Sequence, residues 1–193
     1  MSVDVLWIPL GAGASAARIS GKLYEAGLAW AQHRKPCDLY HAALVIHAPD
    51  GHYVIEQTPV PDSHGAERGV VAGGAVGTRW AGRFRIFRYE VRRWLDGEIP
   101  DVGAAVDSPR RLSDDPVLAQ RVLEAAPLVP TPVWGRDEFR TGEMWNSNSV
   151  IAWILARAGL DLRGVRPPVR GRAPGWKAGL TVAAGQMRPL FVP

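Results

Sequence analysis

LYHAALVIHAPDGHYVIEQTPV, residues 39–60, is the stretch that most directly predicts the fold. Two runs rich in apolar and β-branched residues, 39–47 and 52–60, flank the turn sequence Pro49-Asp50-Gly51. Such runs joined by a short Asp-Gly turn are typical of the two strands of a β-hairpin. We therefore expect a hairpin here, and with it an antiparallel sheet.

Two further strands are predicted outside the hairpin. Residues 3–10 (VDVLWIPL) form an apolar run, and RFRIFRYEVRRW over 83–94 predicts a third long strand. The apolar positions of that strand change parity between Ile86 and Phe87, which indicates a bulge or a bend. The Gly-rich residues 61–79 are expected to be an irregular connection.

Helical spacing of apolar residues predicts three helices. The first covers 16–32, the second runs from Pro116 to about Ala125, and the third follows WNSNS and ends at Gly159. For the second helix the candidate N-caps are Ser113, Asp114 and Asp115.

The combination of strands and helices predicts an α+β fold, with an antiparallel sheet packed against helices. We expect one domain over residues 1–160. Residues 161–193 are basic and rich in Pro and Gly. This C-terminal segment is expected to be coil that packs on the domain or trails from it.

The phrase WNSNS, residues 145–149, directly precedes the third helix and allows two interpretations. Its polar side chains either cap the helix and do nothing more, or they present a nucleophile at the positive end of the helix dipole. Ser147 begins the apolar stripe of the helix and therefore points toward the sheet. The stripe continues through Val150, Ile151, Ile154, Leu155 and Ala158.

A serine nucleophile needs a base to take its proton, and His41 is the candidate. It opens the apolar strand HAALVI, so we expect its ring near one end of the sheet. A third group would orient the imidazole, and the next strand offers Glu56 and Gln57. Glu56 is preferred because its charge would stabilise an imidazolium. The choice depends on the hairpin register, which the turn sequence does not fix. His41, Glu56 and Gln57 are also compatible with ordinary positions on a strand that have no catalytic role.

Taken together, YHAALVIHAPDGHYVIE (40–56) and NSNSV (146–150) resemble motifs of the circularly permuted papain-like group. That group includes NlpC-like, lecithin:retinol acyltransferase-like and PPPDE-like proteins. The resemblance places His41 as base, Glu56 as the third residue and Ser147 where the group carries cysteine. The phrase GEMWNSNS (142–149) also resembles a phrase in actinobacterial proteins, which adds no activity.

This resemblance implies a permuted papain-like fold and hydrolysis or acyl transfer at an amide or ester bond through a Ser–His–Glu site. First-turn amides of the helix would stabilise the oxyanion. The candidate substrate-binding residues are Tyr40, Trp134, Trp145, Asn146 and Asn148. A serine hydroxyl ionises far less readily than a thiol. The alternative is therefore a catalytically silent module that binds a peptide, a lipid or a protein partner.

Composition limits the remaining classes. The chain has 193 residues and no apolar run of about 18 residues, so we expect no membrane span. The single cysteine, Cys37, excludes an internal disulfide and a cysteine-based zinc cluster, and we expect neither metal nor cofactor. A lone cysteine and the lack of a basic leader favour the cytoplasm.

The net charge is +4, with basic runs over 83–93 and 163–172 that could attract anions. No nucleic-acid-binding motif accompanies them, which disfavours a nucleic-acid partner. The substrate class stays open among small molecules, peptides and lipids.

Overall fold

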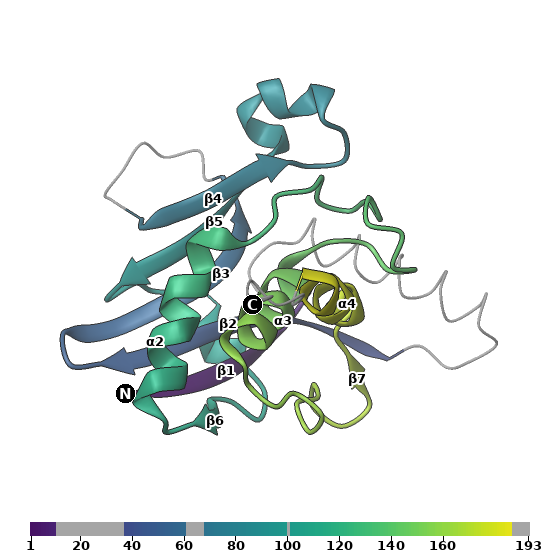
Figure 1. Ribbon diagram of the computed structural model, residues 1–193. Helices are drawn as coiled ribbons and strands as arrows, with labels where there is room; N and C mark the ends of the chain where they lie inside the picture. Colours follow the sequence, from purple (N-terminus) through teal and green to yellow (C-terminus); the bar gives the residue numbers. More distant parts are fainter. Residues whose placement is uncertain (11–36, 61–67, 100, 187–193) are drawn as a thin grey trace, which may run out of the picture.

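The computed structural model describes residues 1–10, 37–60, 68–99 and 101–186 (Figure 1). Within these ranges one sheet has the antiparallel strand order β4-β5-β3-β2-β1-β6, and β7 adds a short parallel pair with β2. The predicted helix over 16–32 lies outside the described residues. The strands are β1 (Ser2–Pro9), β2 (Asp38–Ala48), β3 (Gly51–Pro59), β4 (Val70–Ala75), β5 (Arg88–Leu95), β6 (Arg110–Ser113) and β7 (Gly171–Arg172).

The predicted hairpin is confirmed. β2 and β3 pair from Ala48 opposite Gly51 to Leu44 opposite Ile55. Gly51 has a φ of 140°, and a Cβ there would lie 2.7 Å from Oδ1 of Asp96. A side chain at this turn position would therefore be both strained and obstructed.

Beyond Leu44 and Ile55 the two hairpin strands separate. β3 continues beside β5 as far as Pro59 opposite Tyr89, while β2 continues beside β1. Figure 1 shows β3 rising with β5 and β4 while β2 and β1 run toward the opposite side. This sheet split leaves one edge of β2 without a strand neighbour between Tyr40 and Ala43, since β7 pairs only with Asp38 and Leu39.

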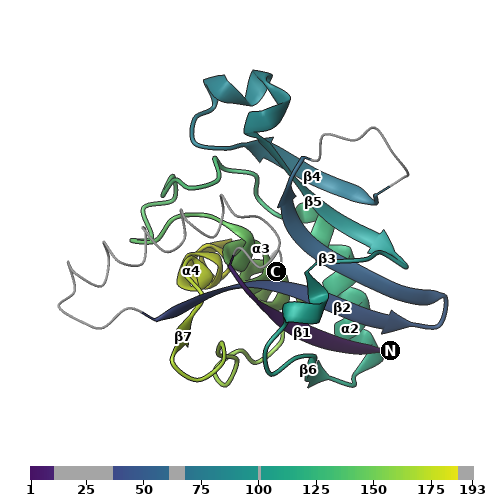
Figure 2. The same ribbon diagram turned by 180° about the vertical axis from the view of Figure 1, so that it is seen from behind.

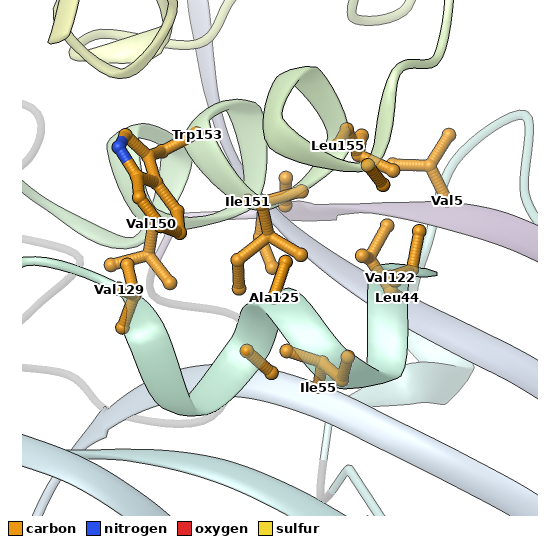
Figure 3. Packing of buried hydrophobic residues seen from close by; sticks show 14 of the residues in the cluster. Val5, Leu44, Ile55, Val122, Ala125, Val129, Val150, Ile151, Trp153 and Leu155 are labelled. Carbon is orange, nitrogen blue, oxygen red and sulfur yellow. The ribbon is translucent and has the colours of Figure 1, made fainter. Parts of the chain in front are cut away.

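Three helices of the described chain lie on one face of the sheet: α2 (Pro116–Ala125), α3 (Ser147–Ala158) and α4 (Trp176–Gln186). Figure 3 shows α2 and α3 meeting over the strands, with Ile151 and Leu155 of α3 facing Ile55, Leu44 and Val5. The predicted limits of α2 and α3 are confirmed. Asp115 caps α2, and Gly159 ends α3 in the left-handed conformation with a φ of 92°.

A smaller apolar cluster covers the other face of the sheet, formed by Leu6, Ile8, Ala43, Val54 and Ile99. Because β1 and β2 are buried on both faces, their sequences are almost continuously apolar rather than alternating. The described residues thus form an α+β fold, as predicted.

Two strand predictions need correction between residues 70 and 88. Residues 70–75 fall in the stretch expected to be irregular, yet they form β4 beside β5. The strand predicted over 83–94 begins only at Arg88, where pairing with Ala75 starts. Before it the chain forms two 3-10 turns, η1 (Trp80–Arg83) and η2 (Arg85–Phe87). The parity change at Ile86 therefore marks a bend, because local turn hydrogen bonds replace the ladder there.

The prediction of coil in the C-terminal segment is wrong for α4 and β7. Gly179 lets α4 lie directly against α3, since a Cβ there would come within 2.2 Å of the Ser149 carbonyl oxygen. From the sequence alone, a glycine that allows close packing of two helices cannot be distinguished from a glycine that ends a helix. None of the helices in the described ranges is long and apolar enough to cross a bilayer.

Replacing Leu155 by Ala should lower the free energy of unfolding by about 2–5 kcal/mol, measured by chemical denaturation. The Leu155 side chain is fully buried at the contact of α3 with the sheet, so truncation leaves a cavity. Leu128→Ala is the control, because Leu128 is 71% exposed and should change stability by no more than about 0.5 kcal/mol. Equal effects of the two changes would contradict this packing.

Candidate functional site

Two of the four polar side chains in WNSNS cap α3. The Asn146 Oδ1 atom accepts hydrogen bonds from the backbone N–H groups of Asn148 (2.9 Å) and Ser149 (3.3 Å). In return the Ser149 hydroxyl accepts one from the backbone N–H of Asn146 at 3.1 Å. This reciprocal pair is a capping box, and it satisfies helix-end donors that would otherwise lack partners.

The Asn148 side chain occupies the open edge of β2 at the sheet split. Its Oδ1 accepts from the backbone N–H of Ala42 at 2.8 Å, and its Nδ2 donates to the carbonyl of Tyr40 at 3.0 Å. A primary amide offers the same donor and acceptor as a peptide group. Asn148 therefore replaces the missing strand neighbour and fixes the start of α3 against β2.

The same polar cluster holds the loop that leads into α4. The Ser149 hydroxyl donates to the Gly175 carbonyl at 2.7 Å, and the Asn146 amide donates to the Pro174 carbonyl at 2.9 Å. A Cβ on Gly175 would lie 2.5 Å from Oδ1 of Asn146. The C-terminal segment is thus attached to the start of α3 by specific contacts.

Ser147 is the exception within WNSNS. Its side chain forms no hydrogen bond within the described part of the chain, although the residue is only 6% exposed. It stands at the first position of α3, where the positive end of the helix dipole favours negative charge. Capping and packing account for the other three polar side chains and leave Ser147 unexplained.

His41 lies on β2 opposite Ile8, on the strand positions that alternate with those facing α3. Tyr40 and Ala42 belong to the helix-side core, so His41 points to the face that carries Ala43. Burial lowers the pKa of the imidazole, and the charge of Asp101 opposes that shift. Burial therefore favours the neutral imidazole, which is the form that can accept a proton. No hydrogen bond joins His41 to Ser147 within the described part of the chain.

Glu56 is held by an arginine and has no hydrogen bond to His41. Arg92 donates from Nη1 to Glu56 at 3.0 Å and from Nε to Glu90 at 2.7 Å, and Arg68 also bonds Glu90 at 3.0 Å. Burial raises the pKa of Glu56, with Arg92 opposing the rise. For Glu90, the hydrogen bonds from the two arginines outweigh burial and lower its pKa.

The register places Gln57, and not Glu56, on the face that α3 covers. Gln57 alternates with Glu56, follows Ile55 on the core-facing side, and pairs with the buried Val91 of β5. The pairing of β2 with β3 ends at Leu44 opposite Ile55, so Gln57 lies on the part of β3 that has left β2. Neither residue forms a hydrogen bond to His41 within the described chain, so which of the two would orient His41 stays a prediction.

Gln57 is 4% exposed, and neither its amide nitrogen nor its amide oxygen has a hydrogen-bond partner within the described part of the chain. Buried polar groups are almost always paired, so an amide with both ends unpaired calls for an explanation. Strand periodicity could have identified Gln57 as a polar residue on the core face if the register had been known.

The aromatic candidates lie around the same end of α3. Tyr40 is buried and its carbonyl receives the Asn148 amide. Trp145 is buried against Phe139, with ring centroids 5.4 Å apart, and its indole N–H has no partner among the described residues. Trp134 is half-buried and meets Tyr89 edge-to-face at 5.8 Å. Their substrate-binding roles, like those of Asn146 and Asn148, stay predictions.

Comparison of the chain with protein-family models, curated proteins and solved structures gave no match. Within the described ranges, no group of three or more His, Cys, Asp or Glu side chains is arranged to hold a metal ion.

Asn148→Ala should lower the free energy of unfolding by at least about 2 kcal/mol, because the backbone groups of Tyr40 and Ala42 lose their side-chain partner together. Ser147→Ala, one position away, removes no hydrogen bond and should cost less than about 1 kcal/mol. Urea denaturation of both variants measures the difference. Similar losses would show that Asn148 does not hold the sheet split.

Proposed function

We propose that the protein is a binding module with a circularly permuted papain-like arrangement. It holds an amide group of a peptide or protein partner at the start of α3 and does not hydrolyse it. The observation that carries this proposal is the buried, unpaired amide of Gln57, which lies on the α3 side of the sheet.

The chemistry of Gln57 supports an amide as the ligand group. A glutamine amide offers both a donor and an acceptor, and another amide can complement both at once. The Ser147 hydroxyl adds one more donor or acceptor at the positive end of α3, where a carbonyl oxygen is favoured. An unpaired buried amide destabilises the free protein, so a partner that satisfies it gains binding free energy.

Three features support binding without catalysis. The His41 ring belongs to the opposite face of the sheet and makes no hydrogen bond to Ser147 within the described chain. Glu56 is bonded to Arg92 and is not available to orient an imidazole. The cap already uses two first-turn amides, those of Asn148 and Ser149, which an oxyanion would need.

The second candidate is a serine hydrolase or acyltransferase acting on an amide or ester. It is favoured by the unpaired Ser147 hydroxyl and by the burial of His41, which lowers the pKa of the imidazole and so favours its neutral form. In this scheme Ser147 Oγ attacks the carbonyl carbon, and its proton passes through His41 to the amine or alcohol that leaves as the C–N or C–O bond breaks. Water or an acceptor hydroxyl then attacks the acyl-serine, and its proton returns through His41 to Ser147. The scheme requires His41 and Ser147 to approach when substrate binds.

The variant Gln57→Leu tests whether the buried amide of Gln57 binds a ligand. Leucine removes the unpaired polar atoms at similar volume, so the free energy of unfolding should rise by about 1–3 kcal/mol. In the wild type, titration with N-methylacetamide should shift the side-chain NMR signals of Gln57, and the variant should lose weak saturable binding of that probe. Gln120→Leu is the matched control, since Gln120 lies exposed on α2.

A stabilised Gln57→Leu variant that still binds the amide probe would exclude Gln57 as the contact. A variant that is destabilised would mean that the amide has partners in solution. Absence of probe binding to the wild type would remove the proposed ligand class.

Labelling at Ser147 tests the catalytic candidate. We expect no reaction of the wild type with a serine-directed fluorophosphonate, because no base touches the hydroxyl. Ser147→Cys should react with iodoacetamide faster at the new thiol than at the half-buried Cys37, since the start of α3 lowers a thiol pKa. Peptide mapping identifies the modified residue. Wild-type labelling that Ser147→Ala abolishes would establish the hydrolase instead.

A further inference from the structure

A projecting segment at the end of the sheet exposes large apolar side chains beside arginines. Residues 79–88, RWAGRFRIFR, form η1 and η2 and stand beyond β4 as the teal turns at the top of Figures 1 and 2. We call this segment the aromatic lobe. Trp80 is 65% exposed and Ile86 is 71% exposed, and Phe84 and Phe87 are also exposed. So many large apolar side chains in one short segment usually mark an interaction surface.

The lobe is held in place by contacts with the chain around residue 136. Arg79 forms a two-pronged ion pair with Glu138 at 2.9 and 3.1 Å, and Arg136 donates to the Gly77 carbonyl at 2.7 Å. Gly82 allows η1 to approach β4, since a Cβ there would lie 2.7 Å from the Ala75 Cβ. The exposed side chains are therefore presented on a fixed support.

The charge of the lobe complements an anionic partner. Arg83 and Arg88 are exposed and form no ion pair within the described chain. An open hollow of about 300 Å³ at the base of the lobe is lined by Arg79, Arg88 and Thr131, among others. Arg79 is already paired with Glu138, so Arg88 is the guanidinium group of this hollow that can bind a phosphate group.

The arrangement of Trp80 favours a lipid surface over single-stranded nucleic acid. Nucleic-acid sites stack bases on open aromatic faces, but the Arg83 guanidinium already lies 3.6 Å from the centre of the Trp80 ring. The most exposed apolar side chain of the lobe, Ile86, is aliphatic and offers no stacking surface. Indole rings, aliphatic tips and adjacent arginines are the combination that binds at a bilayer interface.

We propose that the aromatic lobe docks the protein onto anionic lipid membranes. Trp80, Phe84, Ile86 and Phe87 enter the boundary between headgroups and acyl chains. The exposed Arg83 and Arg88 bind lipid phosphates, Arg88 at the hollow and Arg83 beside Trp80. This interaction is peripheral and needs no spanning helix. It is independent of the amide site at the start of α3.

Vesicle co-sedimentation of the full chain tests the proposal. The wild type should sediment with vesicles of phosphatidylcholine mixed with phosphatidylserine, and much less with phosphatidylcholine alone. Ile86→Ser should reduce the partition coefficient about tenfold, because the apolar tip no longer gains from insertion. Leu128→Ser is a matched control, since Leu128 is also 71% exposed but lies on the 3-10 turn after α2. It should have no effect.

The charge contribution is tested separately. Arg83→Gln and Arg88→Gln should each weaken binding to the mixed vesicles about fivefold, and added salt should weaken the wild type. Arg166→Gln removes the same charge from an exposed position away from the lobe and should leave binding unchanged. Thermal unfolding of each variant checks that the fold is intact.

Four outcomes would overturn the proposal. The first is no sedimentation of the wild type with the mixed vesicles, and the second is equal loss from Ile86→Ser and Leu128→Ser. The third is tight binding of single-stranded oligonucleotide that Ile86→Ser leaves intact, without vesicle binding. Self-association detected by sedimentation velocity and abolished by Ile86→Ser, without vesicle binding, would assign the lobe to a second copy of the chain instead.

Discussion

The arrangement of the sheet and helices depends on one side chain amide, that of Asn148. Where β3 leaves β2, the Ala42 N–H and the Tyr40 carbonyl would face the interior without a strand, and Asn148 satisfies both. Unpaired backbone groups in the interior cost too much to be left open. The amide therefore lets the sheet divide, brings the start of α3 into the split and fixes the height of α3 against the strands.

This division of the sheet also explains the distribution of polar residues around α3. Asn146 and Ser149 close the helix end and hold the loop before α4, so that α4 packs against α3 through Gly179. Ser147 and Gln57 remain as polar groups on the same side of the sheet without a structural partner. Apolar residues at these two buried positions would give a more stable protein, so the polar residues there are better explained by binding than by stability.

On the opposite face, buried charges impose a different constraint. Glu56, Arg92 and Glu90 connect β3 and β5 through short hydrogen bonds, and Arg68 extends the chain of charges. A buried carboxylate with a bound guanidinium is costly to redirect, because separating the pair leaves both charges uncompensated. The network thus ties Glu56 to the sheet. The aromatic lobe shows the reverse situation, with apolar side chains left in solvent beside exposed guanidinium groups.

The sequence by itself determined the hairpin, β1, and the limits of α2 and α3, because each has a local cause. The Asp-Gly turn, the Asp115 cap and the Gly159 stop act within a few residues. It also showed that WNSNS begins a helix whose apolar stripe is buried. Only the tertiary structure decided which polar residue of β3 faces α3, because strand parity depends on a register set by partners far along the chain. The tertiary structure also decided β4, the late start of β5, and α4. The glycines in β4 and α4 predict an interruption of regular structure, but they allow a neighbouring strand or helix to pack closely.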